Sequence, residues 1–209
     1  AERFAKSRFV AFSTGNVYPL TPLRDGGSRE TDAVGPVGTY AQSALAREAV
    51  LEFQSRRNGT PMVVLRLNYA IEPRYGVLRD IADRVWRGER VDLGMGHVNV
   101  IWQRDANELA LRCLLHCESP ARVLNVTGPE TVSVRWLASE FGRIFQKSPV
   151  FTGEEQATAL LSNAAESFRL FGYPPTSLKT MTALIADWVR QGGETLNKPT
   201  HFQQRDGRY

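Results

Sequence analysis

Hydroxyl-bearing residues stand at two places in the sequence where they could act together on one small molecule. Ser13 and Thr14 end an apolar run, and Tyr40 opens the next helical stretch. A phenol can pass a proton to or from a carbonyl or alcohol oxygen, while a serine or threonine hydroxyl holds that oxygen in place. In an open α/β sheet, ligands bind at the carboxyl ends of the strands, where these hydroxyls would lie. The alternative interpretation is that the hydroxyls only end a strand and begin a helix.

The elements that must position these hydroxyls alternate between strands and helices. Apolar runs predict strands over 9–13, 62–65, 98–102 and 123–126. Apolar spacing predicts helices over 40–57, 78–86, 134–145 and 181–188, and another helix that Asp105 would cap. A strand, a helix and a strand in this order form a βαβ unit, which predicts a parallel sheet. The loop over 19–39 is long enough to be functional, and we expect it to act as a lid.

Composition excludes several classes of protein. Of the 209 residues 42% are hydrophobic, so intrinsic disorder is excluded. The net charge of +4 comes from scattered arginines rather than a cluster, so nucleic acid is not an expected partner. No apolar run approaches the roughly 18 residues of a membrane span, so no membrane partner is expected. The 2 cysteines suit no disulfide framework, and a cytoplasmic location is the simplest expectation.

Three other kinds of site are weakly supported. Cys113, His116 and Cys117 share a helix, but the leucines between them favour core packing, so no metal site is predicted. The G-x-S-x-G string of serine hydrolases does not occur. Residues 94–96 hold the first two glycines of a dinucleotide fingerprint, but no strand precedes them and no helix follows. That string is therefore interpreted as a turn.

Two strings resemble the active-site region of the extended short-chain dehydrogenase/reductase family, the NAD-dependent epimerase/dehydratases. They are FSTGNVYP over 12–19 and TYAQSALARE over 39–48. In that family a strand ends in Ser-Ser or Ser-Thr, Val-Tyr follows, and a Tyr-x-x-x-Lys helix comes about 25 residues later. The resemblance aligns Thr14 with the catalytic Ser/Thr, Tyr40 with the catalytic Tyr and Glu48 with the acidic residue of the helix. Leu65-Arg66 and the string over 125–128 resemble further family strings, so the likeness extends over nearly the whole chain.

This resemblance implies an NAD(P)-dependent oxidoreductase that acts on a sugar nucleotide or on a small carbonyl or alcohol compound. Thr14 and Tyr40 would be catalytic. Ser13, Tyr40 and Asn68 would bind NAD or NADP, and Asn16, Tyr69, Trp102 and Gln103 would bind the small-molecule substrate. A homodimer through the helix over 40–57 and the next helix would fit the family's habit.

The implied fold is α/β: the C-terminal part of a Rossmann-type, doubly wound parallel sheet with a small substrate-binding subdomain. Residues 1–72 would form the second half of the dinucleotide-binding core. Residues 73–191 would form the substrate-binding segment, with one core strand near 122–127, and residues 192–209 a polar tail. The family's Gly-rich loop lies in its first βα unit, whereas this sequence resembles the family from near its fifth strand. We therefore expect an N-terminally incomplete chain that is inactive alone. The alternative is a chain that assembles with a separate polypeptide carrying the nucleotide half.

One departure from the family pattern bears directly on the chemistry. Ala44 stands where the family has the Lys whose ammonium stabilises the tyrosinate. Arg47 lies about two turns beyond Tyr40 and could partly replace that charge, although pairing with Glu48 in solvent is the simpler expectation. The loss of the lysine also supports an alternative function, a non-catalytic module that binds a nucleotide or a partner.

Overall fold

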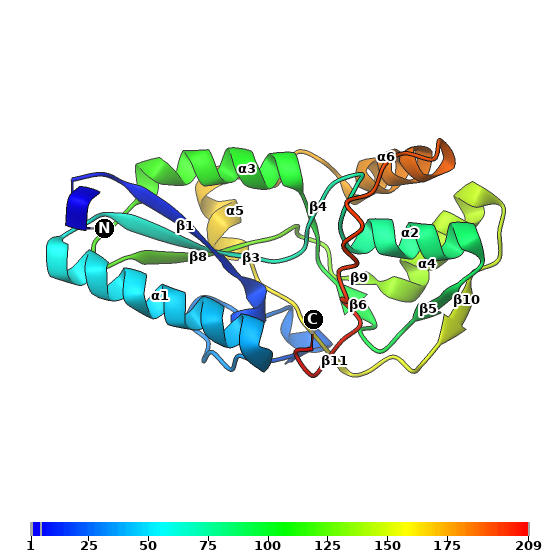
Figure 1. The fold of residues 1–209 in the computed structure, drawn as a ribbon, viewed down its shortest axis with the longest axis horizontal. Helices are drawn as coiled ribbons and strands as arrows, with labels where there is room; N and C mark the ends of the chain where they lie inside the picture. Colours follow the sequence, from blue (N-terminus) through cyan, green and yellow to red (C-terminus); the bar gives the residue numbers. More distant parts are fainter. Residues whose placement is uncertain (1, 5, 209) are drawn as a thin grey trace.

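A three-stranded parallel sheet forms the centre of one half of the molecule (Figure 1). The computed structural model describes residues 2–4 and 6–208. The sheet has the order β1 (Phe9–Thr14), β3 (Met62–Leu67) and β8 (Arg122–Val126), and Thr14 pairs with Leu67, which pairs with Val126. The central strand β3 is buried along almost its whole length because its apolar run is covered on both faces. The carboxyl ends of all three strands therefore meet at one edge.

Helices cover both faces of this sheet (Figure 1). Helix α1 (Gly38–Asn58) lies on one face, and α3 (Gln103–Arg112) and α5 (Ala165–Phe171) lie on the other. The long helix α1 ends at Gly59, which adopts the left-handed conformation that glycine tolerates best. The predicted α/β class and its βαβ unit are confirmed.

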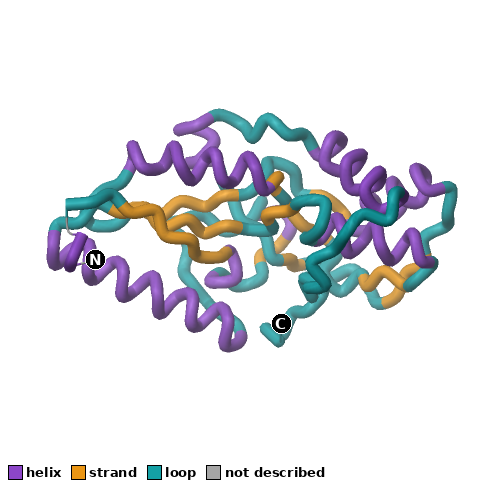
Figure 2. The backbone as a smooth tube through the Cα atoms, turned by 45° about the horizontal axis from the view of Figure 1, so that its top comes forward, coloured by secondary structure: helices purple, strands orange, loops and turns teal. Residues whose placement is uncertain are grey.

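The other half of the molecule is a packed group of three helices. Helices α2 (Val77–Arg87), α4 (Val134–Phe145) and α6 (Leu178–Arg190) enclose the larger apolar core, as their periodic apolar side chains predict. Beside them β5 (Arg90–Asp92) pairs in parallel with β10 (Val150–Thr152). Figure 2 shows the helical group at one end and the sheet at the other, with loops and short strands between them.

Pairs of short strands lie between the two halves (Figure 2). They are β2 (Thr21–Pro22) with β11 (Thr158–Ala159), β4 (Ala70–Ile71) with β7 (Ile101–Trp102), and β6 (His97–Val98) with β9 (Val132–Ser133). The 3-10 turns are η1 (Glu2–Phe4), η2 (Gly15–Val17), η3 (Leu23–Asp25) and η4 (Cys113–His116), and η1 and η4 belong to the sheet half (Figure 1). The prediction of a single strand over 98–102 is wrong. This range holds the end of β6 and the whole of β7, and these two strands pair with different partners. Between them the buried Asn99 donates to the Ser162 carbonyl at 2.6 Å.

Two segments that look like loops in the sequence are each attached to the rest of the molecule at particular residues. The loop over 19–39 pairs with β11 through β2, and the Ser28 amide donates to the Leu161 carbonyl at 2.9 Å. The C-terminal segment over 192–208, interpreted from its composition as a polar tail, contains no helix or strand. It nevertheless runs between the two halves (Figure 1) and buries Phe202 in the larger core.

Asp105 does not cap its helix, contrary to the sequence interpretation. Helix α3 begins two residues earlier, after Trp102, and has no side-chain cap. The buried Asp105 carboxylate instead accepts hydrogen bonds from the amide and hydroxyl of Thr176, at 2.9 and 3.1 Å. It therefore holds the segment before α6 against α3. Among the described residues no helix has both the length and the apolar character needed to cross a bilayer.

Candidate active site

A cleft of about 440 Å³ opens where the carboxyl ends of β1 and β3 face the helical half of the molecule. Its walls come from both halves and from the C-terminal segment. The lining residues are 13, 14, 16, 40, 67–70, 75–77, 103 and 199–202. This is the place where an open parallel sheet presents its ligand site.

Thr14 and Tyr40 both line this cleft, as their sequence positions predict. Thr14 is the last residue of β1, is 7% exposed, and its hydroxyl accepts a hydrogen bond from the Asn16 amide at 3.2 Å. Tyr40 lies in the first turn of α1 and is 54% exposed, so its phenol can reach a bound molecule. Asn16 lines the same cleft.

The residues expected at a cofactor, Ser13 and Asn68, also line the cleft but are partly committed to the protein. The Ser13 hydroxyl donates to the Glu48 carboxylate. The Asn68 side chain is buried and donates to Asn99 Oδ1 at 2.8 Å. Both side chains therefore build the floor of the cleft.

The remaining predicted substrate residues divide into two groups. Tyr69 and Gln103 line the cleft, whereas Trp102 is absent from its lining and packs against the larger core. Tyr69 has a φ of 41°, and His201 on the opposite wall has a φ of 50°. Left-handed backbone in residues other than glycine costs about 1–3 kcal/mol and tends to occur at functional sites.

A buried polar network fixes the strand ends beneath the cleft. Glu48 of α1 accepts from Arg66 of β3, with 2.7 Å between Oε2 and Nη2. Arg66 also donates to the Tyr18 hydroxyl at 2.7 Å, and this hydroxyl donates to Asn125 of β8 at 2.9 Å. With Ser13 the network joins β1, α1, β3 and β8. Each charged member has an opposite charge or a hydrogen-bond partner, as buried charges require.

The charge states in this network follow from burial and pairing. Burial raises the pKa of the Tyr18 phenol, although its bonds with Arg66 and Asn125 act to lower it. Burial acts to lower the pKa of Arg66, but its bonds to Glu48 and Tyr18 raise it overall. Tyr18 is therefore a neutral phenol and Arg66 a cation, so the network carries one buried ion pair.

The expected pairing of Arg47 with Glu48 in solvent is wrong. The guanidinium of Arg47 donates to the Phe12 carbonyl on β1 at 2.9 Å, and Glu48 is buried with Arg66. Ala44, at the position of the family's lysine, is 2% exposed and packs with Val17 and Tyr18. An apolar cluster thus fills the place where the family pattern has a cation.

The cysteine and histidine cluster is a packing feature, as expected. His116 contacts the ring of Phe171 edge-on, and the thiol of Cys117 donates to the Phe9 carbonyl at 3.3 Å. Burial raises the pKa of Cys113 to about 12. Within residues 2–4 and 6–208 no group of three or more His, Cys, Asp or Glu is placed to hold a metal ion.

Sequence reasoning placed residues 66–75, and so Tyr75, on the substrate side, but it missed the part of the wall formed by Gly76, Val77 and residues 199–202. Tyr75 is half-buried, and burial together with nearby Asp80 and Tyr40 raises the pKa of its phenol. Gly76 has a φ of 119°, and a Cβ there would lie 2.5 Å from Ile71 Cγ2. This glycine before a helix was the available sequence signal. No periodic pattern marks residues 199–202.

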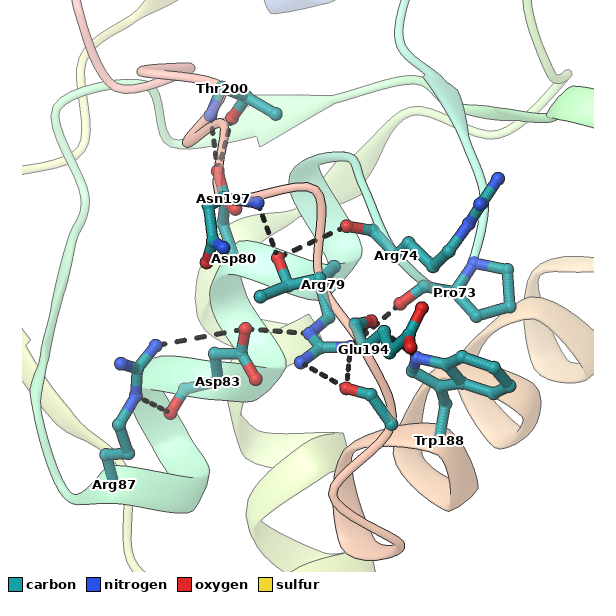
Figure 3. Close-up of polar contacts among 12 residues, drawn as sticks. Pro73, Arg74, Arg79, Asp80, Asp83, Arg87, Trp188, Glu194, Asn197 and Thr200 are labelled. Atoms are coloured by element: carbon teal, nitrogen blue, oxygen red, sulfur yellow. Dashed lines mark hydrogen bonds and ion pairs between the residues drawn. The ribbon is translucent and has the colours of Figure 1, made fainter.

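Figure 3 shows how helix α2 holds this C-terminal segment. The buried guanidinium of Arg79 lies between Asp83, at 2.7 Å, and the carbonyls of Pro73 (2.9 Å), Gly193 and Glu194. The next residue of α2 is Asp80, whose carboxylate accepts from both the amide and the hydroxyl of Thr200, at 2.8 and 2.6 Å. These contacts hold His201 and its neighbours against the cleft.

The fold is similar to solved structures of two UDP-sugar epimerases with NAD and of a protein with NADPH. Thermus thermophilus UDP-glucose 4-epimerase in complex with NAD superposes with a TM-score of 0.76 at 21% identity, over 90% of this chain and 65% of that one. Bacillus cereus UDP-glucuronic acid 4-epimerase, in complex with UDP-glucuronic acid and NAD, superposes with a TM-score of 0.74 at 18% identity, over 88% of this chain and 62% of that one. RMD from Pseudomonas aeruginosa, complexed with NADPH, superposes with a TM-score of 0.73 at 23% identity, over 87% of this chain and 66% of that one.

This chain has the fold of part of those enzymes. It spans about 62–66% of the length of the three structures. The prediction of a partial, Rossmann-type α/β fold is therefore confirmed. No protein-family model and no curated protein sequence matches the chain.

Proposed function

We propose that the protein is an NAD(P)-dependent oxidoreductase of the epimerase/dehydratase type, which acts on an alcohol or carbonyl group held in the cleft. The observation that carries this proposal is that Thr14 and Tyr40 line one cleft at the carboxyl ends of β1 and β3, in the fold of NAD-dependent epimerases. The activity proposed is that of the whole natural protein.

The residues present suit the nicotinamide end of such a cofactor. Hydroxyl and amide groups of Thr14, Tyr40 and Asn68 line the cleft, and these neutral donors and acceptors match ribose hydroxyls and a carboxamide. When bound, the nicotinamide would supply or accept the hydride. Thr14 would hold the substrate oxygen by a hydrogen bond, and Tyr40 would give a proton to that oxygen or take one from it. Because Ala44 supplies no cation, the phenolate form of Tyr40 would lack the stabilisation that the family's lysine gives.

The test is the turnover of the whole natural protein with alcohol and carbonyl substrates, followed by the absorbance of reduced nicotinamide. Tyr40→Phe should lower kcat by about 10²–10⁴-fold, the usual contribution of a general acid or base. Tyr173→Phe is the matched control, since this tyrosine is 71% exposed and lies outside the cleft lining. Equal turnover by Tyr40→Phe and the native protein would refute the proposed role.

A second candidate function is a non-catalytic module that binds a nucleotide or a partner. The apolar packing of Ala44 supports it, because a phenolate without a cation is poorly stabilised. The same experiment separates the two candidates. A binding module would show no turnover with either cofactor, and Tyr40→Phe would change only ligand affinity.

A further inference from the structure

The polar lining of the cleft consists of phenol, hydroxyl, amide and imidazole groups. Among the described residues that line it, none is Arg, Lys, Asp or Glu. The polar groups include the phenols of Tyr40, Tyr69 and Tyr75, the hydroxyl of Thr200 and the imidazole of His201. A diphosphate is bound in proteins mainly by arginine and lysine, whose charge-assisted hydrogen bonds are about twice as strong as neutral ones.

Three arginines, at positions 74, 79 and 205, make contacts within the protein outside the cleft lining. Arg79, two residues after the lining residue Val77, is enclosed by Asp83 and the carbonyls of the C-terminal segment (Figure 3). Arg74, next to Tyr75, pairs with Glu72 at 2.9 Å. Arg205 donates to the Thr158 carbonyl and to its hydroxyl. None of these three guanidinium groups lines the cleft.

The helix N-termini at the cleft do not replace these cations. Helices α2 and α3 begin beside the cleft, and a helix N-terminus attracts anions with its partial positive charge. However, each helix already has a carboxylate in its first turn, Asp80 in α2 and Asp105 in α3. These two carboxylates oppose the helix dipoles and disfavour a further pair of negative charges.

From this distribution of charge we propose that the substrate of this cleft is an uncharged compound of monosaccharide size with several hydroxyl groups, and not a nucleotide diphosphate sugar. This proposal rests on the proposed function and departs from the sugar nucleotides bound by the structural neighbours. Phenols, amides and threonine hydroxyls donate and accept neutral hydrogen bonds, which suits hydroxyl groups on a ring. The volume of about 440 Å³ is in the lower half of the range for ligand pockets, roughly 300–1,000 Å³.

The test compares methyl α-D-glucopyranoside with UDP-glucose, which adds a charged diphosphate and a uridine to the same sugar. Each is titrated into the ¹⁵N-labelled protein at about 0.15 M salt, and the amide signals of Gly76, Val77 and His201 report binding at the cleft. Two charge-assisted hydrogen bonds to a diphosphate would strengthen binding by roughly 10²–10⁴-fold. We expect the two dissociation constants to differ by less than about threefold.

A variant with one added cation shows that the assay can detect diphosphate binding. Gln103 lines the cleft, and its side chain donates only to the exposed Asn107, so Gln103→Arg disturbs no buried network. We expect this variant to bind UDP-glucose at least tenfold more tightly than the native protein. If Gln103→Arg binds UDP-glucose no more tightly than the native protein does, the explanation that the cleft lacks cations is overturned.

Two other results would overturn the proposal. One is native binding of UDP-glucose at least 100-fold tighter than that of methyl glucoside, and the other is the absence of any cleft response to methyl glucoside. The titrations contain no nicotinamide cofactor, so they do not depend on hydride transfer. If the proposed function is wrong, the whole natural protein shows no turnover. If this proposal is wrong, the ratio of the dissociation constants of UDP-glucose and methyl glucoside differs from the one expected.

Discussion

Breaking the buried ion pair between Glu48 and Arg66 should lower the free energy of unfolding by several kcal/mol more than breaking a surface ion pair of the same helix. Glu48 and Glu52 lie one turn apart on α1, and each has an arginine nitrogen 2.7 Å from a carboxylate oxygen. The pairs differ in burial: the Glu48 and Arg66 side chains are both 8% exposed, whereas those of Glu52 and Arg56 are 34% and 65% exposed. This makes Glu52→Gln the matched control for Glu48→Gln.

Glu48→Gln keeps the shape of the side chain but leaves the Arg66 charge buried without an anion. Breaking a buried pair in this way costs about 3–5 kcal/mol, whereas an exposed i,i+4 pair contributes about 0.3–0.5 kcal/mol. For a protein of this size 1 kcal/mol corresponds to roughly 2–4 °C in Tm. We therefore expect Glu48→Gln to lower Tm by about 6–20 °C and Glu52→Gln by less than about 2 °C.

Urea denaturation followed by tryptophan fluorescence measures both variants as free energies of unfolding. The double variant Glu48→Leu with Arg66→Met should recover part of the loss, because it removes the uncompensated charge along with its partner. If Glu48→Gln costs no more than Glu52→Gln, the network does not hold the strand ends as described.

Three further predictions concern other parts of the fold. Gly38→Ala should destabilise the protein by about 1–3 kcal/mol more than Gly59→Ala. Both glycines have a positive φ, but only a Cβ at Gly38 would meet the Gly207 carbonyl oxygen, at 2.3 Å. Equal free energies of unfolding for the two variants would contradict the contact between the C-terminal segment and α1. Because burial raises the pKa of Cys113 to about 12, this thiol should resist iodoacetamide at pH 8 until guanidinium unfolds the protein, and rapid native labelling found by mass spectrometry would be inconsistent with its burial. Hydrogen bonding to Arg169, and then to Arg122, lowers the pKa of Glu166 from 4.5 to about 2, so its stabilising effect is present above pH 4.5 and is lost as pH falls toward 2. Glu166→Gln should therefore flatten that part of a plot of urea midpoint against pH, and an unchanged slope would exclude this role.

Apolar runs and apolar periodicity in the sequence predict the individual strands and helices of the fold. The apolar run of β3 and the spacing of α1 were sufficient for the βαβ unit, and this unit brings Thr14 and Tyr40 to one cleft. Glu48 and Arg66 were each noted in the sequence, but their pairing depends on how α1 packs on the sheet. Periodicity carries no information about that packing.

The C-terminal wall of the cleft could not be predicted for a related reason. Thr200 is held by Asp80, which is 120 residues away in the sequence, and neither residue belongs to a recognisable motif. The buried Phe202 lies in a polar stretch, so composition suggested a tail. Asp105 has the residue type of a helix cap, but its tertiary bonds to Thr176 determine its actual role.

The most direct test of the proposed active site is calorimetric titration of NAD⁺ and NADPH into the whole natural protein. The account predicts saturable binding of at least one of them, weakened about tenfold or more by Tyr40→Ala and unchanged by Tyr173→Ala. Absence of saturable binding by both cofactors, or binding that Tyr40→Ala leaves unchanged, would contradict it.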